Sequence, residues 1–222
     1  MKQFVIIGAG GLGQEILWAA ANRHAVLPQF DFLGFCDDAP LRQSGNYRGL
    51  PLLGSPEEAA RALTGEVFFV CGIGNNFARQ DLVERADRLG WKAESVIDPS
   101  VLIAPGVRVG AGTYVGAFSI LAPGAALGGH VIVNHGCSIG HDSILGEFSQ
   151  VCPGGRVSGH VELGRGAFLG SNAVVAPGVA LGAWARLGAA SFAVRDIPSG
   201  ATAVGNPARI VFNGPAKPGV RP

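Results

Sequence analysis

The sequence predicts a chain of two parts, an α/β unit with a small parallel sheet over residues 1–100 and a parallel β-solenoid over residues 101–210. Two observations support this prediction. Strand-like and helix-like segments alternate in the first hundred residues, and an aliphatic residue then recurs at every sixth position. Neither pattern continues beyond residue 210, so we expect residues 211–222 to form a flexible tail.

The first part contains three strand, turn and helix segments. Apolar runs predict the strands, and helical spacing of apolar residues predicts the helices. Ser55 and Pro56 give the second helix a favourable N-cap and first position. The strands are expected at residues 4–7, 30–36 and 66–73, and the helices at residues 14–22, from residue 56, and at residues 77–89. This alternation predicts a Rossmann-like parallel sheet with a ligand crevice at the carboxyl ends of its strands.

Glycines follow the first predicted strand in the sequence GAGGLG. Gly8, Gly10 and Gly13 satisfy the GxGxxG pattern of dinucleotide-binding proteins. A nicotinamide dehydrogenase also needs a second mononucleotide-binding half and a catalytic domain, and the first hundred residues contain neither. A helix that begins behind a glycine turn still offers backbone N–H groups to a pyrophosphate. We therefore expect a nucleotide diphosphate here, with a purely structural turn as the alternative.

The second part has a strict six-residue period. Every sixth residue from Ile103 to Leu187 is Ile, Val or Leu, and the residue after each of them is small. A period of six does not fit a helix, but it fits a triangular solenoid of short strands whose aliphatic side chains point inward. Eighteen residues then form one coil.

Composition and charge exclude several classes of function. The net charge of +1 comes without a basic stripe, which disfavours nucleic acid as a partner. The four cysteines contain no CxxC pair, and we interpret them as reduced packing residues. The apolar opening is too short for a signal peptide or a membrane span, so we expect a cytoplasmic protein without a membrane partner.

Histidines gather on the predicted solenoid at positions where aliphatic packing does not need them. His141 and Asp142 fall on the outer surface near a corner, and an imidazole beside a carboxylate is a base with an orienting partner. Gly159 lies one coil further on, about 4.8 Å from His141, the spacing between neighbouring strands. Its N–H is placed to stabilise an oxyanion. A surface imidazole without a role is the alternative.

The repeat resembles the left-handed parallel β-helix of hexapeptide-repeat acyltransferases. The segments GAGGLG, FCDD and IGNNFAR, joined to such a repeat, are similar to those of bacterial N-acetyltransferases that acetylate nucleotide-linked 4-amino-4,6-dideoxy sugars, with sialic acid O-acetyltransferase-like proteins as relatives. Within that family the chain most resembles the GDP-perosamine N-acetyltransferases. The resemblance implies acetyl-CoA as co-substrate, a nucleotide-linked amino sugar as acceptor, a role in surface-polysaccharide synthesis and a homotrimer.

The resemblance also implies roles in the first unit. Gly10 and Gly11 are expected to contact phosphate. Asp37, Asp38, Asn75 and Asn76 are expected to contact base or ribose. The nucleotide-sugar site as a whole is expected to include Gly8, Gly10, Gly11, Gly13, Asp37, Asp38, Gly74, Asn75 and Asn76. A solvated strand end is the alternative for Asp37. The choice among GDP, UDP and dTDP stays open, as do the sugar stereochemistry and the acyl length.

On the solenoid the resemblance implies that His141 is the general base and that Asp142 orients it. Asn134 is expected to hydrogen-bond nearby, and Gly159 to contact the thioester oxygen. One relative has a histidine where Gln150 stands here. In the closing segment AVGNPAR, Pro207 and Arg209 are expected to bind coenzyme A, with ordinary surface charge as the alternative for Arg209.

Three other functions are suggested by parts of the sequence. His130 and His135 are spaced like zinc ligands of hexapeptide carbonic anhydrases, but that site needs a third histidine about two coils earlier, and none lies between His24 and His130, so we expect no metal. The nearest alternative is O-acetylation of a sugar of the sialic acid type. The third alternative is a non-catalytic nucleotide-sugar binding protein. Such a protein would be expected to have lost the pair of histidine and acidic residue, which is intact here.

Overall fold

The computed structural model describes residues 1–38, 46–47 and 49–214, and the chain divides into two compact units, Met1–Pro99 and Ser100–Pro222. The elements of the first unit are β1 (Lys2–Ile7), α1 (Gly11–Val26), β2 (Phe30–Cys36), β3 (Asn46–Tyr47), β4 (Leu50–Pro51), α2 (Pro56–Ala62), β5 (Val67–Cys71), α3 (Asn76–Arg88), β6 (Lys92–Ala93) and β7 (Val96–Ile97).

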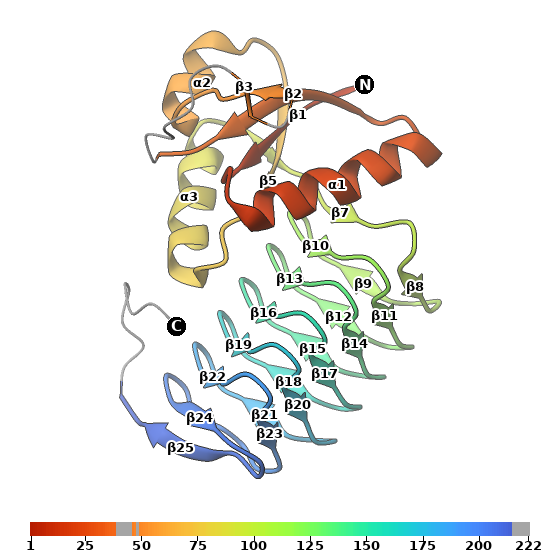
Figure 1. The fold of residues 1–222 in the computed structure, drawn as a ribbon, viewed down its shortest axis with the longest axis vertical. Coiled ribbons are helices and arrows are strands. Elements are labelled where there is room, and N and C mark those ends of the chain that lie inside the picture. The colour runs from red at the N-terminus through yellow and green to blue at the C-terminus, as the bar shows by residue number, and fades with distance from the viewer. Residues whose placement is uncertain (39–45, 48, 215–222) are drawn as a thin grey trace. The chain divides into compact units, whose positions relative to one another are not determined.

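The first unit is built on a parallel sheet with the strand order β2, β1, β5, β6 (Figure 1). Its central strand β1 is fully buried over residues 4–7, as expected for a strand covered on both faces. Ser55 caps α2 in a reciprocal capping box with Glu58, which confirms the predicted helix start. The predicted parallel α/β fold is confirmed, and the crossing from β1 to β2 places the glycine turn at the carboxyl edge of the sheet.

Short strands on three faces make up the second unit. They are β8 (Leu102–Ile103), β9 (Arg108–Val109), β10 (Tyr114–Val115), β11 (Ile120–Leu121), β12 (Ala126–Leu127), β13 (Ile132–Val133), β14 (Ser138–Ile139), β15 (Ile144–Leu145), β16 (Gln150–Val151), β17 (Arg156–Val157), β18 (Glu162–Leu163), β19 (Phe168–Leu169), β20 (Val174–Val175), β21 (Ala180–Leu181), β22 (Arg186–Leu187), β23 (Phe192–Ala193), β24 (Thr202–Val204) and β25 (Arg209–Phe212).

The strand register confirms the predicted coil of eighteen residues. Leu121 pairs with Ile139, and Ile139 pairs with Val157, so each residue lies beside the one eighteen positions later. The unit is a left-handed parallel β-helix, and its three faces follow one another around each coil (Figure 1). We call them by their strands the β13 face, the β14 face and the β15 face, in the order in which the chain visits them.

Each corner of the prism uses a left-handed backbone residue. Every sixth residue from Gly106 to Ala190 has a φ between 54° and 82°. Glycine adopts this conformation freely, whereas other residues give up about 1–2 kcal/mol. The residues other than glycine at these places are Phe118, His130, Asp142, Phe148, His160, Asn172, Trp184 and Ala190.

The tail expected from residue 211 was wrong in its first residues. Val211 and Phe212 belong to β25, which turns back and pairs antiparallel with β24. No apolar pattern indicated this strand, because β25 is an exposed edge strand without an inward row of aliphatic residues. Residues 215–222 lie outside the described part of the chain.

Candidate functional site

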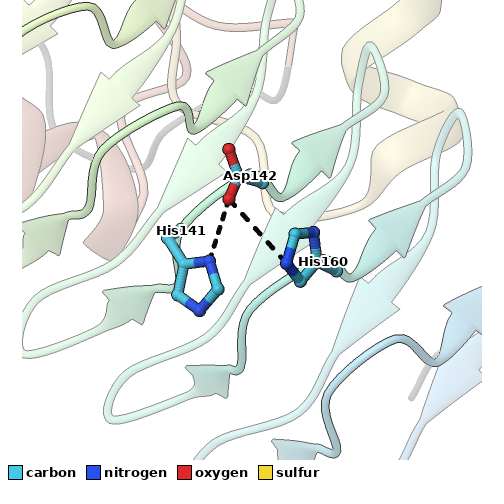
Figure 2. Close-up of side chains that lie close together, drawn as sticks. All are labelled: His141, Asp142 and His160. Carbon is cyan, nitrogen blue, oxygen red and sulfur yellow. Dashed lines mark hydrogen bonds and ion pairs between the residues drawn. The ribbon is translucent and has the colours of Figure 1, made fainter.

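One corner of the prism combines two histidines and a carboxylate. It lies between the β14 and β15 faces, and we call it the His141 corner, formed by His141, Asp142, Gly159 and His160. His141 Nδ1 and Asp142 Oδ2 are 2.9 Å apart, and His160 Nε2 lies 3.9 Å from the same oxygen. The two imidazoles meet edge to face with centroids 4.8 Å apart. Figure 2 shows both rings turning a nitrogen toward the carboxylate.

The contact with Asp142 determines which nitrogen of His141 is basic. An ionised carboxylate only accepts hydrogen bonds, so the Nδ1–H of a neutral His141 donates to Asp142 and the lone pair lies on Nε2. Figure 2 shows that this second nitrogen points away from the carboxylate. With side-chain exposures of 58% and 55%, both residues are open to a ligand. His141 can therefore accept a proton at Nε2 while Asp142 stabilises the resulting imidazolium.

Asp142 and His160 occupy left-handed backbone positions that are glycine elsewhere in their column. The column runs through Gly106, Gly124, Asp142, His160 and Gly178, at intervals of eighteen residues. Side chains are retained at two of these five places although glycine would be less strained. Strain that is retained beside an exposed polar cluster is typical of functional sites.

Glycines leave room for the two catalytic candidates. A Cβ on Gly159 would lie 2.6 Å from Cε1 of His141, so the imidazole rests directly on the backbone of residue 159. This confirms the predicted stacking of the two residues across one coil. A Cβ on Gly124 would overlap the Asp142 carboxylate. The Gly159 N–H has no backbone acceptor among the described residues, so it can donate to a ligand beside Nε2.

The structure does not bring Asn134 to the His141 corner of the same chain. Asn134 lies at the corner between the β13 and β14 faces, at the other end of β14, because the chain turns once in every six residues. Six extended residues span up to about 20 Å. Asn134 is 6% exposed, and its Oδ1 has no hydrogen-bond partner among the described residues. A buried polar atom of this kind can accept a hydrogen bond from water, from a ligand or from a second subunit.

Gln150 and the cysteines do not supply a nucleophile. Gln150 is buried and donates to Cys152 Sγ at 3.5 Å rather than facing His141. Burial raises the pKa of Cys137 to about 11 and the pKa of Cys36 and Cys71 to about 12. These thiols stay protonated at neutral pH, which agrees with their interpretation as packing residues.

The glycine turn of the first unit exposes backbone. Gly10 is the N-cap of α1 without a side-chain cap, and a Cβ on Gly10 or Gly11 would meet nothing within 4 Å. Gln14 is the first residue whose N–H donates within the helix, to Gly10 O at 3.1 Å, so the preceding N–H groups lack helical acceptors. A Cβ on Gly13 would overlap the Gly8 carbonyl oxygen. Two glycines thus close the turn, and two leave it open for an anion.

The two aspartates after β2 have protein partners. Asp37 Oδ2 accepts from the N–H of Ala9 at 2.8 Å and thereby fixes the glycine turn. Asp38 forms a bidentate pair with Arg85 of α3, and Arg85 also binds Glu57 of α2. This ion pair lowers the pKa of Glu57 to about 2. The sequence alone did not indicate Arg85.

The loop after β5 is held by a buried arginine. Arg79 is 1% exposed, and its Nη1 donates to the carbonyl oxygen of Ile73 at 2.8 Å. Asn75 caps α3 by accepting from the N–H groups of Phe77 and Ala78, at 3.0 and 3.1 Å. Gly74 is exposed and Asn76 is buried. A charged residue inside an amphipathic helix looks like a surface residue, so its burial could not be predicted.

The remaining candidates lie near the end of the β-helix. Arg209 and Pro207 are exposed, Arg209 as the first residue of β25. Arg186, which the sequence did not indicate, stacks on Phe168 at 4.5 Å, and burial lowers its pKa.

The two histidines with zinc-like spacing lie apart, because His130 stacks on Phe148 at a different corner from His135. In the described part of the chain, every helix is too short or too polar to span a bilayer.

Comparisons with known proteins show which family and fold the chain resembles. The sequence profile of the PglD N-terminal domain matches residues 3–86. A histidine-to-asparagine mutant of perosamine N-acetyltransferase from Caulobacter crescentus, solved with CoA and GDP-perosamine, is 30% identical, with 96% of this chain and 98% of that chain covered and a TM-score of 0.86. Comparison with curated proteins gives no significant match.

Two further solved structures are similar over almost their whole length. The acetyltransferase domain of PglB from Neisseria gonorrhoeae, in complex with acetyl coenzyme A, is 29% identical, with 95% of this chain and 99% of that chain covered and a TM-score of 0.84. WeeI from Acinetobacter baumannii is 24% identical, with 95% and 100% covered and a TM-score of 0.80, and supports the fold alone.

Proposed function

This chain belongs to the family of hexapeptide-repeat sugar N-acetyltransferases, and we propose that it acetylates the 4-amino group of a nucleotide-linked 4-amino-4,6-dideoxy sugar. It is an acetyl-CoA-dependent N-acetyltransferase. The similarity to an enzyme solved with GDP-perosamine favours that compound as the acceptor. The observation that supports the proposal best is the His141 corner, where a base and an oxyanion donor lie side by side.

The reaction needs one proton acceptor and one oxyanion donor. The sugar amine attacks the thioester carbonyl carbon, and His141 Nε2 accepts the proton that the nitrogen loses. The Gly159 N–H stabilises the oxyanion of the tetrahedral intermediate. When the intermediate collapses, the carbon–sulfur bond breaks and coenzyme A leaves as a thiolate. Asp142 orients His141 throughout and stabilises its charged form.

The two units supply different binding surfaces. In this proposal the glycine turn at Gly10 and Gly11 binds the diphosphate through the backbone N–H groups at the start of α1. Asp37 holds that turn rather than binding the ligand through the oxygen that Ala9 occupies. Coenzyme A lies along the prism, with Arg209 beside its phosphates and its thioester at His141.

We infer that the catalytic unit is a homotrimer with a site between each pair of subunits. Asn134 lies one face away from His141 in the same chain, and its buried Oδ1 has no partner in the part of the chain that the structure describes. A neighbouring prism packed against the β14 face would bring its Asn134 corner to the His141 corner. Outward side chains on that face include the exposed Leu102 and Ile120, which suit a contact with a second copy.

Complementation tests this arrangement. His141→Asn and Asn134→Ala subunits are each expected to be nearly inactive as homotrimers. If each site uses His141 of one subunit and Asn134 of the next, random mixing gives one intact site in every mixed trimer, or about one quarter of wild-type activity. Denaturation and co-refolding of the two variants, followed by sedimentation and assay, measures this. No recovered activity in a verified mixed trimer would show that both residues serve one subunit.

The acceptor is tested with a panel of nucleotide-linked 4-amino sugars that carry GDP, UDP or dTDP, with coenzyme A release as the readout. A 4-hydroxy analogue of the best acceptor is included to measure O-transfer. We expect release with amines and the highest kcat/KM with GDP-perosamine. Preference for the hydroxyl acceptor would contradict N-acetylation, and equal turnover with all nucleotides would contradict recognition of the base.

A further inference from the structure

We propose that His141, Asp142 and His160 form a binding site for a first-row transition metal ion, with Zn²⁺ as the best fit, and that the bound ion switches off the catalytic base. Among the described residues these three side chains are the group of histidine, cysteine or acidic residues whose donor atoms lie within 4.8 Å of one another. Inhibition, unlike binding, rests on the proposed role of His141 as the base.

The spacing of the donors is close to that of a metal site. In tetrahedral zinc sites the metal lies about 2.0–2.2 Å from nitrogen and oxygen, which puts neighbouring ligand atoms about 3.3 Å apart. Asp142 Oδ2 lies 2.9 Å from His141 Nδ1 and 3.9 Å from His160 Nε2. Figure 2 shows both nitrogens facing the same carboxylate, so small rotations of exposed side chains bring all three donors onto one ion.

The donor types select the metal. Two imidazoles and one carboxylate suit Zn²⁺, Cu²⁺ and Ni²⁺, whereas Mg²⁺ and Ca²⁺ prefer oxygen ligands alone. The ligands come from two successive coils, and the left-handed backbones at Asp142 and His160 aim both side chains out of the same column. Three protein ligands leave the remaining coordination positions for water, as in open zinc sites.

Metal binding would reverse the tautomer of His141. In the metal-free site the proton lies on Nδ1 and donates a hydrogen bond to Asp142, so Nε2 holds the basic lone pair. A metal ion takes the place of that proton and needs the Nδ1 lone pair. The proton of the neutral imidazole then lies on Nε2, which can no longer accept one from the sugar amine. Inhibition follows from the loss of this basic lone pair.

The first test measures binding without substrates. Chelator-stripped full-length protein is titrated with ZnCl₂ by calorimetry and by competition with a chromogenic chelator. We expect one ion per chain and affinity weakened by at least about tenfold in His160→Asn, because loss of supporting groups costs 10–100-fold or more. Asparagine suits the left-handed backbone, and His160→Gly is the second variant should asparagine disturb the corner. His135→Asn, which removes an exposed histidine from another corner, is the matched control.

The second test measures the consequence for catalysis. Zn²⁺ should inhibit the wild type and His135→Asn, EDTA should reverse it, and Mg²⁺ at the same concentration should have no effect. His160→Asn should lose most of the sensitivity, measured against its own activity without metal, whereas capture of Zn²⁺ by released coenzyme A thiol would affect both proteins equally. Nitrogen-15 NMR of the histidine rings should show the His141 proton moving from Nδ1 to Nε2 with Zn²⁺.

The outcomes separate the two proposals. Absence of stoichiometric Zn²⁺ binding, or equal loss of affinity in His160→Asn and His135→Asn, would overturn the metal site and leave the acetyltransferase mechanism untouched. Binding that depends on His160 without inhibition would confirm the metal site and contradict the role of His141 Nε2 as the base.

Discussion

Glycine contributes to the candidate sites of the two units in different ways. In the turn between β1 and α1, glycines at Gly10 and Gly11 remove side chains so that backbone N–H groups face an open space. On the β-helix, the column of left-handed corner positions that includes the candidate site has glycine at three of its five places, and Asp142 and His160 stand at the other two. One site is thus built from exposed backbone and the other from side chains retained against local backbone preference.

This difference shows what each site can do. Backbone N–H groups at a helix start recognise negative charge through a fixed direction, and they have no group that exchanges protons near neutral pH. The His141 corner provides an imidazole with a lone pair that can accept a proton, oriented by Asp142 at 2.9 Å. We therefore expect substitutions at the glycine turn to change substrate binding, and substitutions at the His141 corner to change turnover.

The largest effect is expected for His141→Asn. Asparagine keeps a polar group of similar reach but cannot accept a proton at neutral pH, and loss of a general base costs about 10²–10⁴-fold in rate. kcat should fall by that order while the KM for acetyl-CoA stays nearly unchanged, as steady-state kinetics can measure. Near-normal turnover at pH 7 with an unchanged pH profile would contradict the assignment of His141.

A smaller loss of turnover is expected for Gly159→Ala. The new Cβ would overlap Nε2 of the His141 ring and push the ring away, so we expect kcat to fall about 10–100-fold, as misplacement of a catalytic group can. Gly129→Ala is the matched control, because Gly129 occupies the same place in its hexapeptide and its Cβ would meet only Ala111 O, at 3.4 Å. Equal losses in both variants would indicate a general effect on the coil.

The period of the sequence was sufficient to predict the β-helix, because one aliphatic residue in every six must point inward whichever residues surround it. It also placed Gly159 beside His141 correctly, since eighteen residues return the chain to the same corner. The same arithmetic shows why Asn134 is not at that corner. The seven residues from Asn134 to His141 lead from one corner of the prism to the next. A family motif that gives only their spacing in the sequence does not show this separation.

Contacts between distant segments could not be predicted. Arg79 and Arg85 lie on one helix, yet Arg79 is buried against the loop at Ile73 while Arg85 binds Asp38 and Glu57. Their sequence surroundings do not distinguish them, because the partners come from other elements of the sheet. The strand β25 was missed for a similar reason, since its pairing with β24 depends on a chain reversal and not on an apolar pattern.

Gly10→Val should change the binding of the nucleotide sugar. The position has extended backbone and open space around its Cα, so valine fits the fold but covers the N–H groups behind it. We expect the KM for the nucleotide sugar to rise about tenfold or more, comparable with loss of one or two charge-assisted hydrogen bonds. The KM for acetyl-CoA should stay unchanged. Equal increases in both constants would show that the turn is only structural.

The smallest effect is expected for Glu57→Gln, which tests whether the ion pairs of Arg85 with Asp38 and Glu57 contribute to stability. The ion pair lowers the pKa of Glu57 in the folded protein from its usual 4.5 to about 2. Its stabilisation is therefore present above about pH 4.5 and is lost as the pH falls toward 2. Exposed pairs contribute at most about 1 kcal/mol, so the melting temperature at pH 7 should fall by only about 2 °C. Scanning calorimetry from pH 7 to pH 3 should show the melting temperatures of the wild type and the variant converging.

Glu66→Gln, which removes a partner of the exposed Lys92, is the matched control and should have less effect at pH 7. A difference between Glu57→Gln and the wild type that persists undiminished at pH 3 would show that the lost stability comes from packing of the side chain and not from its charge.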